Sequence, residues 1–146
     1  MWRAAFVVAL CTLASVASAT YYPSKFVLTG GSANASLSTS ATHYFPMGME
    51  RTSTTGQFEH WARFPRLFPH RMYCQASGSP GAGKSYTITI QRYGVVTDWS
   101  CAIAEGNSTC EDTSGAAIAV GLNEYASVPA GTPTARNIDC ILEGRL

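Results

Sequence analysis

The sequence predicts an all-β protein built as an antiparallel sandwich or barrel. Alternating apolar and polar residues dominate from about residue 72 onward, and turns rich in Gly, Pro, Ser and Thr separate these segments at spacings of about ten residues. Helix signals are nearly absent, because no window combines an apolar i, i+3, i+4 stripe with capping residues.

Residues 1–19 have the pattern of a secretory signal peptide. Arg3 supplies a positive charge, residues 4–17 form a run of low polarity, and residues 17–19 form an A-x-A cleavage site. Cleavage before Thr20 leaves one domain, residues 20–146, which we expect to be extracellular. Loss of Arg3 leaves nine basic and nine acidic side chains. Such a neutral chain is a poor nucleic-acid binder, and no later stretch reaches the ~18 apolar residues of a membrane span.

Several strands can be assigned from local patterns. Residues 85–93 and 95–104 alternate with period two around Tyr93 and Gly94, which predicts a hairpin that turns there. Further strands are expected at 116–120, 124–128 and 136–143, and an exposed strand and loop at 29–42.

Four cysteines follow the signal peptide, and an even number in an oxidising compartment indicates two disulfides. Cys101 and Cys110 flank a strand end and a tight turn. Cys74 lies on a middle strand and Cys140 on the last, and such strands often neighbour each other in a sandwich. We therefore predict the pairs Cys101–Cys110 and Cys74–Cys140. A metal site is disfavoured because the sequence contains no C-x-x-C and no His pair at the spacing of metal ligands.

Residues 78–85, GSPGAGKS, match the phosphate-binding loop G-x-x-x-x-G-K-[ST]. That chemistry needs a helix after the loop, whereas the residues that follow alternate as a strand. We therefore interpret the motif as a Gly/Pro-rich loop with Lys84 at the entrance of a strand.

No catalytic constellation stands out. None of His43, His60 and His70 lies in a nucleophile elbow or a metal-binding helix, and no pair of glutamates is singled out for glycoside hydrolysis. The sequence therefore predicts a protein that is not an enzyme and needs no cofactor or metal.

Residues 58–73 interleave aromatic and arginine side chains. They could form core or subunit contacts, or a patch that stacks on sugars or binds an acidic partner. The candidate interface or ligand residues are Trp61, Arg63, Phe64, Arg66, Phe68 and Arg71.

Two N-glycosylation sequons lie in expected loops. Their acceptors are Asn34 and Asn107.

Residues 80–97 and the segments that follow resemble a recurrent pattern in small β proteins of tailed bacteriophages and their environmental relatives. In that pattern a PGAGKSYT strand leads to a basic turn and then to a Thr-rich strand with C-x-I. The matching segments are 80–90, 92–97, 101–103, 110–113 and 131–133, together with Ala135. Tyr93 stands where the pattern usually has Asn, and Leu122-Asn123 where Gly-Asp usually stands.

This resemblance implies a jelly-roll fold, similar to the trimeric heads of complement-type and tumour-necrosis-factor-like proteins, and a virion or fibre component. The signal peptide is a departure, since a phage protein assembled in the cytoplasm does not need one. The virion role is therefore not carried over directly.

Together these observations predict an all-β, jelly-roll-type antiparallel sandwich with two disulfides. Its expected function is a secreted structural or assembly subunit that associates with itself as a fibre, coat or trimer, through exposed apolar residues within 44–73. The alternative is a secreted module that binds a glycan or a cell-surface receptor.

Overall fold

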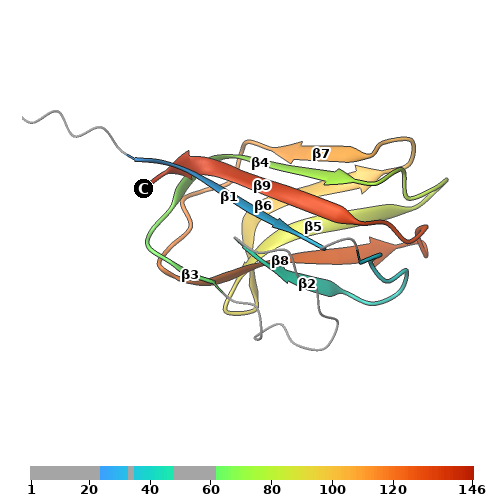
Figure 1. Cartoon of the computed structure of the whole chain (residues 1–146), viewed down its shortest axis with the longest axis horizontal. Helices are drawn as coiled ribbons and strands as arrows, with labels where there is room; N and C mark the ends of the chain where they lie inside the picture. Colours follow the sequence, from blue (N-terminus) through green and yellow to red (C-terminus); the bar gives the residue numbers. More distant parts are fainter. Residues whose placement is uncertain (1–23, 33–34, 48–61) are drawn as a thin grey trace, which may run out of the picture.

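The computed structural model describes residues 24–32, 35–47 and 62–146. Over these residues the chain forms nine β-strands arranged in two facing layers (Figure 1). The strands are β1 (Lys25–Gly31), β2 (His43–Pro46), β3 (Ala62–Phe64), β4 (Phe68–Ala76), β5 (Ser85–Arg92), β6 (Val95–Ala104), β7 (Thr109–Asp112), β8 (Gly121–Ala130) and β9 (Ile138–Arg145).

Both sheets are antiparallel. The first has the order β1-β9-β4-β7, and the second has the order β2-β8-β5-β6, with β3 also paired to β8. β2 and β3 occupy successive lengths of one edge of β8, opposite residues 124–127 and 121–123. The pairings are nested along the chain: β5 pairs with β6, β4 with β7, β2 and β3 with β8, and β1 with β9.

The core lies between the sheets and follows the period-two alternation of the strands. Every second residue of a strand points to the same face, so one set from each sheet is removed from water. The second sheet contributes Phe45, Tyr86, Ile88, Ile90, Trp99, Ile103 and Tyr125, and the first contributes Met72, Cys74, Ile138, Cys140 and Leu142, all at most 1% exposed. The core of the sandwich is therefore the layer of side chains buried between the two sheets.

The predicted hairpin is confirmed. β5 and β6 are joined by Tyr93 and Gly94, whose φ angles of 52° and 75° are both positive. Two-residue turns of this kind match the right-handed twist of the flanking strands. Glycine adopts positive φ freely, whereas Tyr93 is an uncommon residue for this conformation.

The prediction of a strand at 116–120 is wrong. Only one bridge forms there, in which the backbones of Leu67 and Ile118 exchange two hydrogen bonds of 2.9 Å. The Ala116 carbonyl instead accepts a hydrogen bond from the Trp99 indole at 2.7 Å. Residues 116–119, which lie beside the Trp99 ring, therefore form a loop, although their local pattern is that of a strand.

Two other strands have different limits from those expected. β8 runs from Gly121 to Ala130, longer than the expected 124–128 at both ends. At Pro129 it pairs with β5 alone, because the β2 pairing ends at Ser127, and proline is tolerated where one side of a strand is unpaired. β9 begins at Ile138 and ends at Arg145, two residues later than predicted at each end.

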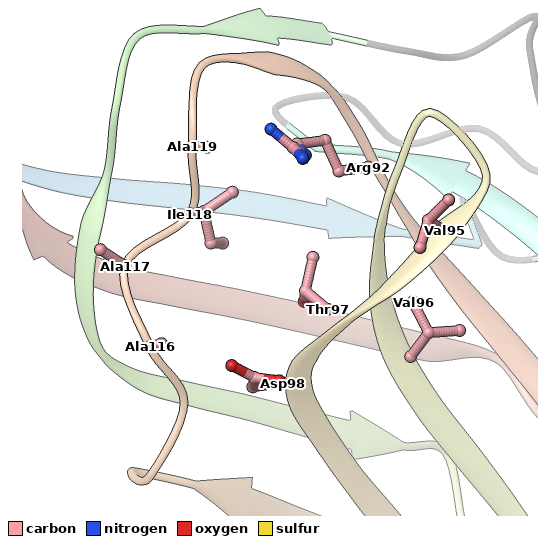
Figure 2. A pocket seen from close by; sticks show the side chains of 9 residues that line it. All are labelled: Arg92, Val95, Val96, Thr97, Asp98, Ala116, Ala117, Ile118 and Ala119. Atoms are coloured by element: carbon pink, nitrogen blue, oxygen red, sulfur yellow. The ribbon is translucent and has the colours of Figure 1, made fainter.

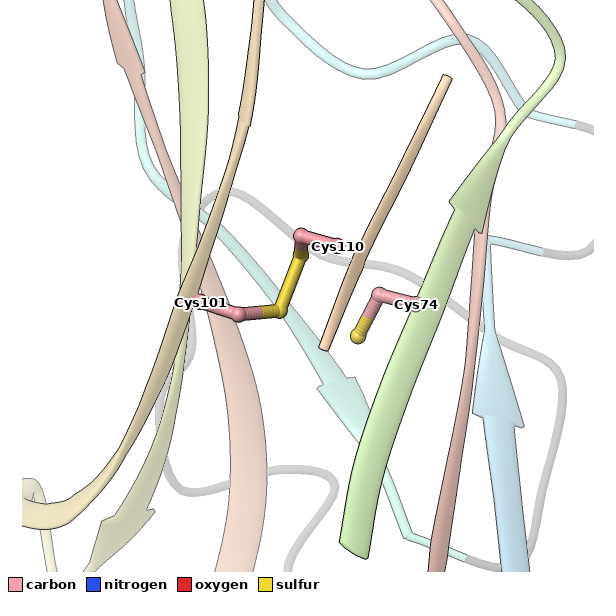
Figure 3. A group of neighbouring side chains, drawn as sticks. All are labelled: Cys74, Cys101 and Cys110. Atoms are coloured by element: carbon pink, nitrogen blue, oxygen red, sulfur yellow. A yellow bond between two sulfur atoms is a disulfide. The ribbon is translucent and has the colours of Figure 1, made fainter. Parts of the chain in front are cut away.

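Both predicted disulfides are present. Cys74–Cys140 joins β4 to β9 within the first sheet, and Cys101–Cys110 joins β6 of the second sheet to β7 of the first. Cys140, Cys74 and Cys110 are register partners on three successive strands. Figure 3 shows the Cys101–Cys110 bond crossing between the layers beside the Cys74 sulfur.

The two disulfides should stabilise the fold unequally. Sequence separations of 66 and 9 residues correspond, in the chain-entropy model, to about 4 kcal/mol for Cys74–Cys140 and about 3 kcal/mol for Cys101–Cys110. We expect the Cys74→Ala, Cys140→Ala variant to lose more free energy of unfolding in urea than the Cys101→Ala, Cys110→Ala variant. An equal loss, or the reverse order, would contradict the entropic assignment.

Candidate functional site

A surface hollow of about 200 Å³ lies beside the β5–β6 hairpin (Figure 2). Its walls are the end of β5, the first half of β6 and the segment 116–119, which runs alongside. Arg92 and Asp98 are its charged residues, and valine, isoleucine and alanine side chains supply most of the remaining lining. We call this the hairpin hollow.

The wall formed by 116–119 is held in place by two buried side chains. One oxygen of Asp112 accepts hydrogen bonds from the Ser114 amide at 2.8 Å and the Ser114 hydroxyl at 2.7 Å, and the other accepts from the Ser100 amide at 2.9 Å. The Trp99 indole binds the Ala116 carbonyl, and a Cβ added to Gly115 would meet that ring at 2.4 Å. The loop therefore has few alternative positions.

Four large apolar side chains in or near this hollow are exposed to solvent. Val95 is 68% exposed, Val96 55%, Val120 53% and Tyr93 49%. Val95 and Val96 line the hollow, while the Tyr93 ring lies against Gly121, next to Val120. We call these four residues the hairpin surface. The sequence could have predicted part of this surface. Two consecutive valines directly after a two-residue turn point to opposite faces of a strand, so both cannot face the core.

The predicted patch in 58–73 is divided by the fold. Trp61 lies outside the described residues. The backbone of Arg63 and Phe64 belongs to β3, which pairs in the second sheet, whereas Phe68 and Arg71 lie on β4 in the first.

Within the predicted 44–73 interface, some apolar residues are core residues. Phe45, Met47 and Leu67 are at most 1% exposed. Phe68 is 47% exposed, with the Arg66 guanidinium 5.1 Å from its ring centre. Of the predicted patch, the structure therefore leaves Arg66, Phe68 and Arg71 together near the outer face of the first sheet.

A second hollow, of about 440 Å³, lies at this point and is lined by Lys25, Phe68, His70 and Arg145. A neighbouring hollow of about 260 Å³ shares Lys25 and His70 and is also lined by Val27 and Glu143. We call the two together the basic hollow. Lys25 and Arg145 were not predicted as site residues, because they lie at opposite ends of the sequence and meet only through the β1–β9 pairing.

The acidic groups near the basic hollow are already engaged. Arg71 donates to Glu111 at 2.9 Å and lies 3.7 Å from Glu143, which is also 4.0 Å from His70. The hydrogen bond and charge of Glu111 raise the pKa of Arg71, so this side chain stays a cation. Among the described residues, no carboxylate lies within ion-pair distance of Lys25, Arg66 or Arg145.

Three other sequence features are resolved by the structure. The loop GSPGAGKS is followed by β5, as expected, and its Gly83 amide donates to the Glu105 carboxylate at 2.8 Å. The sulfurs of Cys74, Cys101 and Cys110 lie within 4.8 Å of one another, but each is bonded in a disulfide and is no free thiolate ligand. Asn107 is exposed in the turn before β7, whereas Asn34 lies outside the described residues.

Comparisons with known proteins do not assign a family. No protein-family model matches the chain, and a search of curated proteins finds no match. Over the residues that the structure describes, no helix has the length and apolar character needed to span a membrane.

The Asp112 interactions predict a specific pH dependence. Burial raises the pKa of Asp112, but the hydrogen bonds from Ser100 and Ser114 outweigh this and place the pKa below its ordinary value. A depressed pKa in the folded state contributes stability that is present above the unfolded pKa of about 4 and is lost as the pH falls through the folded value.

We expect Asp112→Asn to lower the free energy of unfolding by about 1 to 2 kcal/mol at neutral pH, since the carboxylate's charge-assisted hydrogen bonds are weakened. The difference from wild type should shrink below about pH 4. Urea unfolding at a series of pH values measures this, with the exposed Asp98→Asn as control. A difference that does not change with pH would contradict the proposed role of the charge.

Proposed function

We propose that this chain is a secreted jelly-roll subunit that associates with copies of itself through the hairpin surface. The nested pairing of β1 with β9, β2 and β3 with β8, β4 with β7, and β5 with β6 supports the jelly-roll assignment, because it describes one long hairpin wound into two sheets. The signal-peptide pattern at 1–19 and two disulfides support an oxidising, extracellular location.

The observation that carries self-association is the exposure of Tyr93, Val95, Val96 and Val120 on neighbouring elements. Single exposed apolar residues need no explanation, but several exposed around one hairpin favour a contact surface. A second copy can cover it with the same group by two-fold symmetry, and burial gives about 25 cal/mol per Å². A near-neutral chain adds little repulsion between copies.

The contact is expected through side chains rather than by adding a strand. β6 is an edge strand of the second sheet, but the Asp112 carboxylate occupies the Ser100 amide. Blocking an edge amide with a charged group is a common protection against edge-to-edge pairing. We therefore expect β6 to contact a second copy through the side chains of Val95 and Val96 at its start.

Light scattering after size exclusion tests this with the secreted, non-reduced protein. We expect wild type to exceed the mass of one chain, and Val95→Asp with Val96→Asp to be a monomer, because two buried, unpaired carboxylates oppose the contact. The matched control is Val27→Asp with Val128→Asp, which changes two other exposed valines by the same charge and should keep the wild-type mass.

A monomeric wild-type protein would contradict self-association. If the control lost association to the same extent, the location at the hairpin surface would be wrong. Near-ultraviolet circular dichroism of both double variants verifies that each retains packed aromatic residues.

A second function, recognition of a glycan, is favoured by the basic hollow. Here an exposed aromatic ring, Phe68, adjoins several cations, an arrangement suited to stacking and hydrogen bonding with a polar ligand. Both proposed functions are surface contacts, and neither assigns a catalytic step.

A further inference from the structure

We propose that the basic hollow binds an anionic saccharide, one that carries sulfate or carboxylate groups. This inference rests on the second proposed function and is independent of self-association. Its ligand residues are Lys25, Phe68, His70 and Arg145, with Arg66 beside the aromatic ring.

The register of the first sheet places two like charges directly opposite each other. Lys25 pairs with Arg145 across β1 and β9, and Arg145 pairs with Phe68 across β9 and β4. Neighbouring strands are about 4.8 Å apart, and like charges in directly opposite positions destabilise a sheet. An anion between the two cations would remove this repulsion, so the pairing of Lys25 with Arg145 favours a site for an anionic ligand.

The positive charge of the hollow is not neutralised from within the described chain. Glu143 is shared between Arg71 and His70, and Glu111 is bonded to Arg71. Lys25, Arg66 and Arg145 have no carboxylate partner among the described residues. In a chain of formal net charge +1, this is a local concentration of cations and not a general basic character.

The aromatic ring indicates the rest of the ligand. Phe68 is 47% exposed and lines the larger of the two hollows together with Lys25, His70 and Arg145. The Arg66 guanidinium lies over its ring at 5.1 Å. A saccharide offers an apolar C–H face to such a ring and presents its anionic substituents to the cations, whereas a bare inorganic anion would leave the ring unused. Single-stranded nucleic acid prefers a basic groove with successive stacking aromatics. Here Phe68 is the exposed phenylalanine, whereas Phe26, which lines the smaller hollow, is partly buried against the core.

The test measures binding of the full, non-reduced chain to heparin, hyaluronan and neutral dextran at about 0.15 M salt, where weak long-range attraction is screened. We expect heparin, which carries sulfate and carboxylate groups, to bind and dextran not to bind. Binding of hyaluronan, whose charged groups are carboxylates, would show that carboxylate groups are sufficient. Affinity should fall as salt concentration rises, because binding releases ions.

The decisive comparison uses two identical substitutions. Lys25→Glu changes a residue that lines the hollow. Lys84→Glu makes the same change just before β5, and the start of β5 lies at the opposite end of the sandwich from Phe68, at the start of β4 (Figure 1). Lys25→Glu should weaken binding by about tenfold, a difference of about 1.4 kcal/mol, and Lys84→Glu by less than about twofold. Phe68→Ala should weaken saccharide binding without changing the salt dependence, because the ring is uncharged.

Each other result overturns the inference in a recognisable way. Equal loss in both lysine variants would assign binding to net charge and not to this hollow. Binding of dextran as strong as that of heparin would leave glycan recognition standing but remove the anionic requirement. Binding of oligo-dT in place of any saccharide would replace the ligand class, and absence of all saccharide binding would overturn both the inference and the second function. Thermal melting verifies that Lys25→Glu is folded.

Discussion

The disulfide between Cys101 and Cys110 is the constraint on which the hairpin hollow depends, because it ties β7 to the opposite sheet. β7 has four residues and pairs along one side with β4, so its position rests on that short ladder and on the sulfur bridge. Two residues after Cys110, the Asp112 carboxylate binds the edge of β6 and fixes the loop that leads to 116–119. The position of the 116–119 wall of the hairpin hollow therefore depends on the Cys101–Cys110 disulfide.

The two proposed surfaces belong to different sheets and can act together. The hairpin surface is built on the β5–β6 turn, the start of β6 and the residue before β8, whereas the basic hollow is built on β1, β4 and β9. Neither surface shares a residue with the other. Self-association would thus leave the basic hollow accessible and would present several copies of it to a long anionic polymer. Linked copies bind such a ligand more tightly than one copy can, because later contacts are intramolecular.

Local patterns were sufficient for features formed within a short length of chain. The β5–β6 hairpin follows from period-two alternation around Tyr93-Gly94, and Cys101–Cys110 spans one turn. Cys74–Cys140 was also predicted, because a middle strand and the last strand of a sandwich often neighbour each other. The prediction of a strand at 116–120 was wrong because the Ala116 carbonyl binds the indole of Trp99, a residue 17 positions earlier in the sequence. A local pattern of residues cannot indicate such a contact. The resemblance of residues 80–135 to phage β proteins remains a prediction.

The candidate site was harder to predict than the fold because a sandwich separates residues that are close in sequence. Residues 58–73 look like one aromatic and basic patch, yet the chain crosses from the second sheet to the first between Phe64 and Phe68. What remains of the patch is completed by residues from both ends of the domain: Lys25 and Arg145 are brought beside Phe68 by the β1-β9-β4 ladder. Composition could not reveal this grouping, since an almost neutral chain conceals a local cluster of cations. In a nested antiparallel fold, strand register decides which charges meet, and it therefore decides where a ligand of opposite charge is attracted.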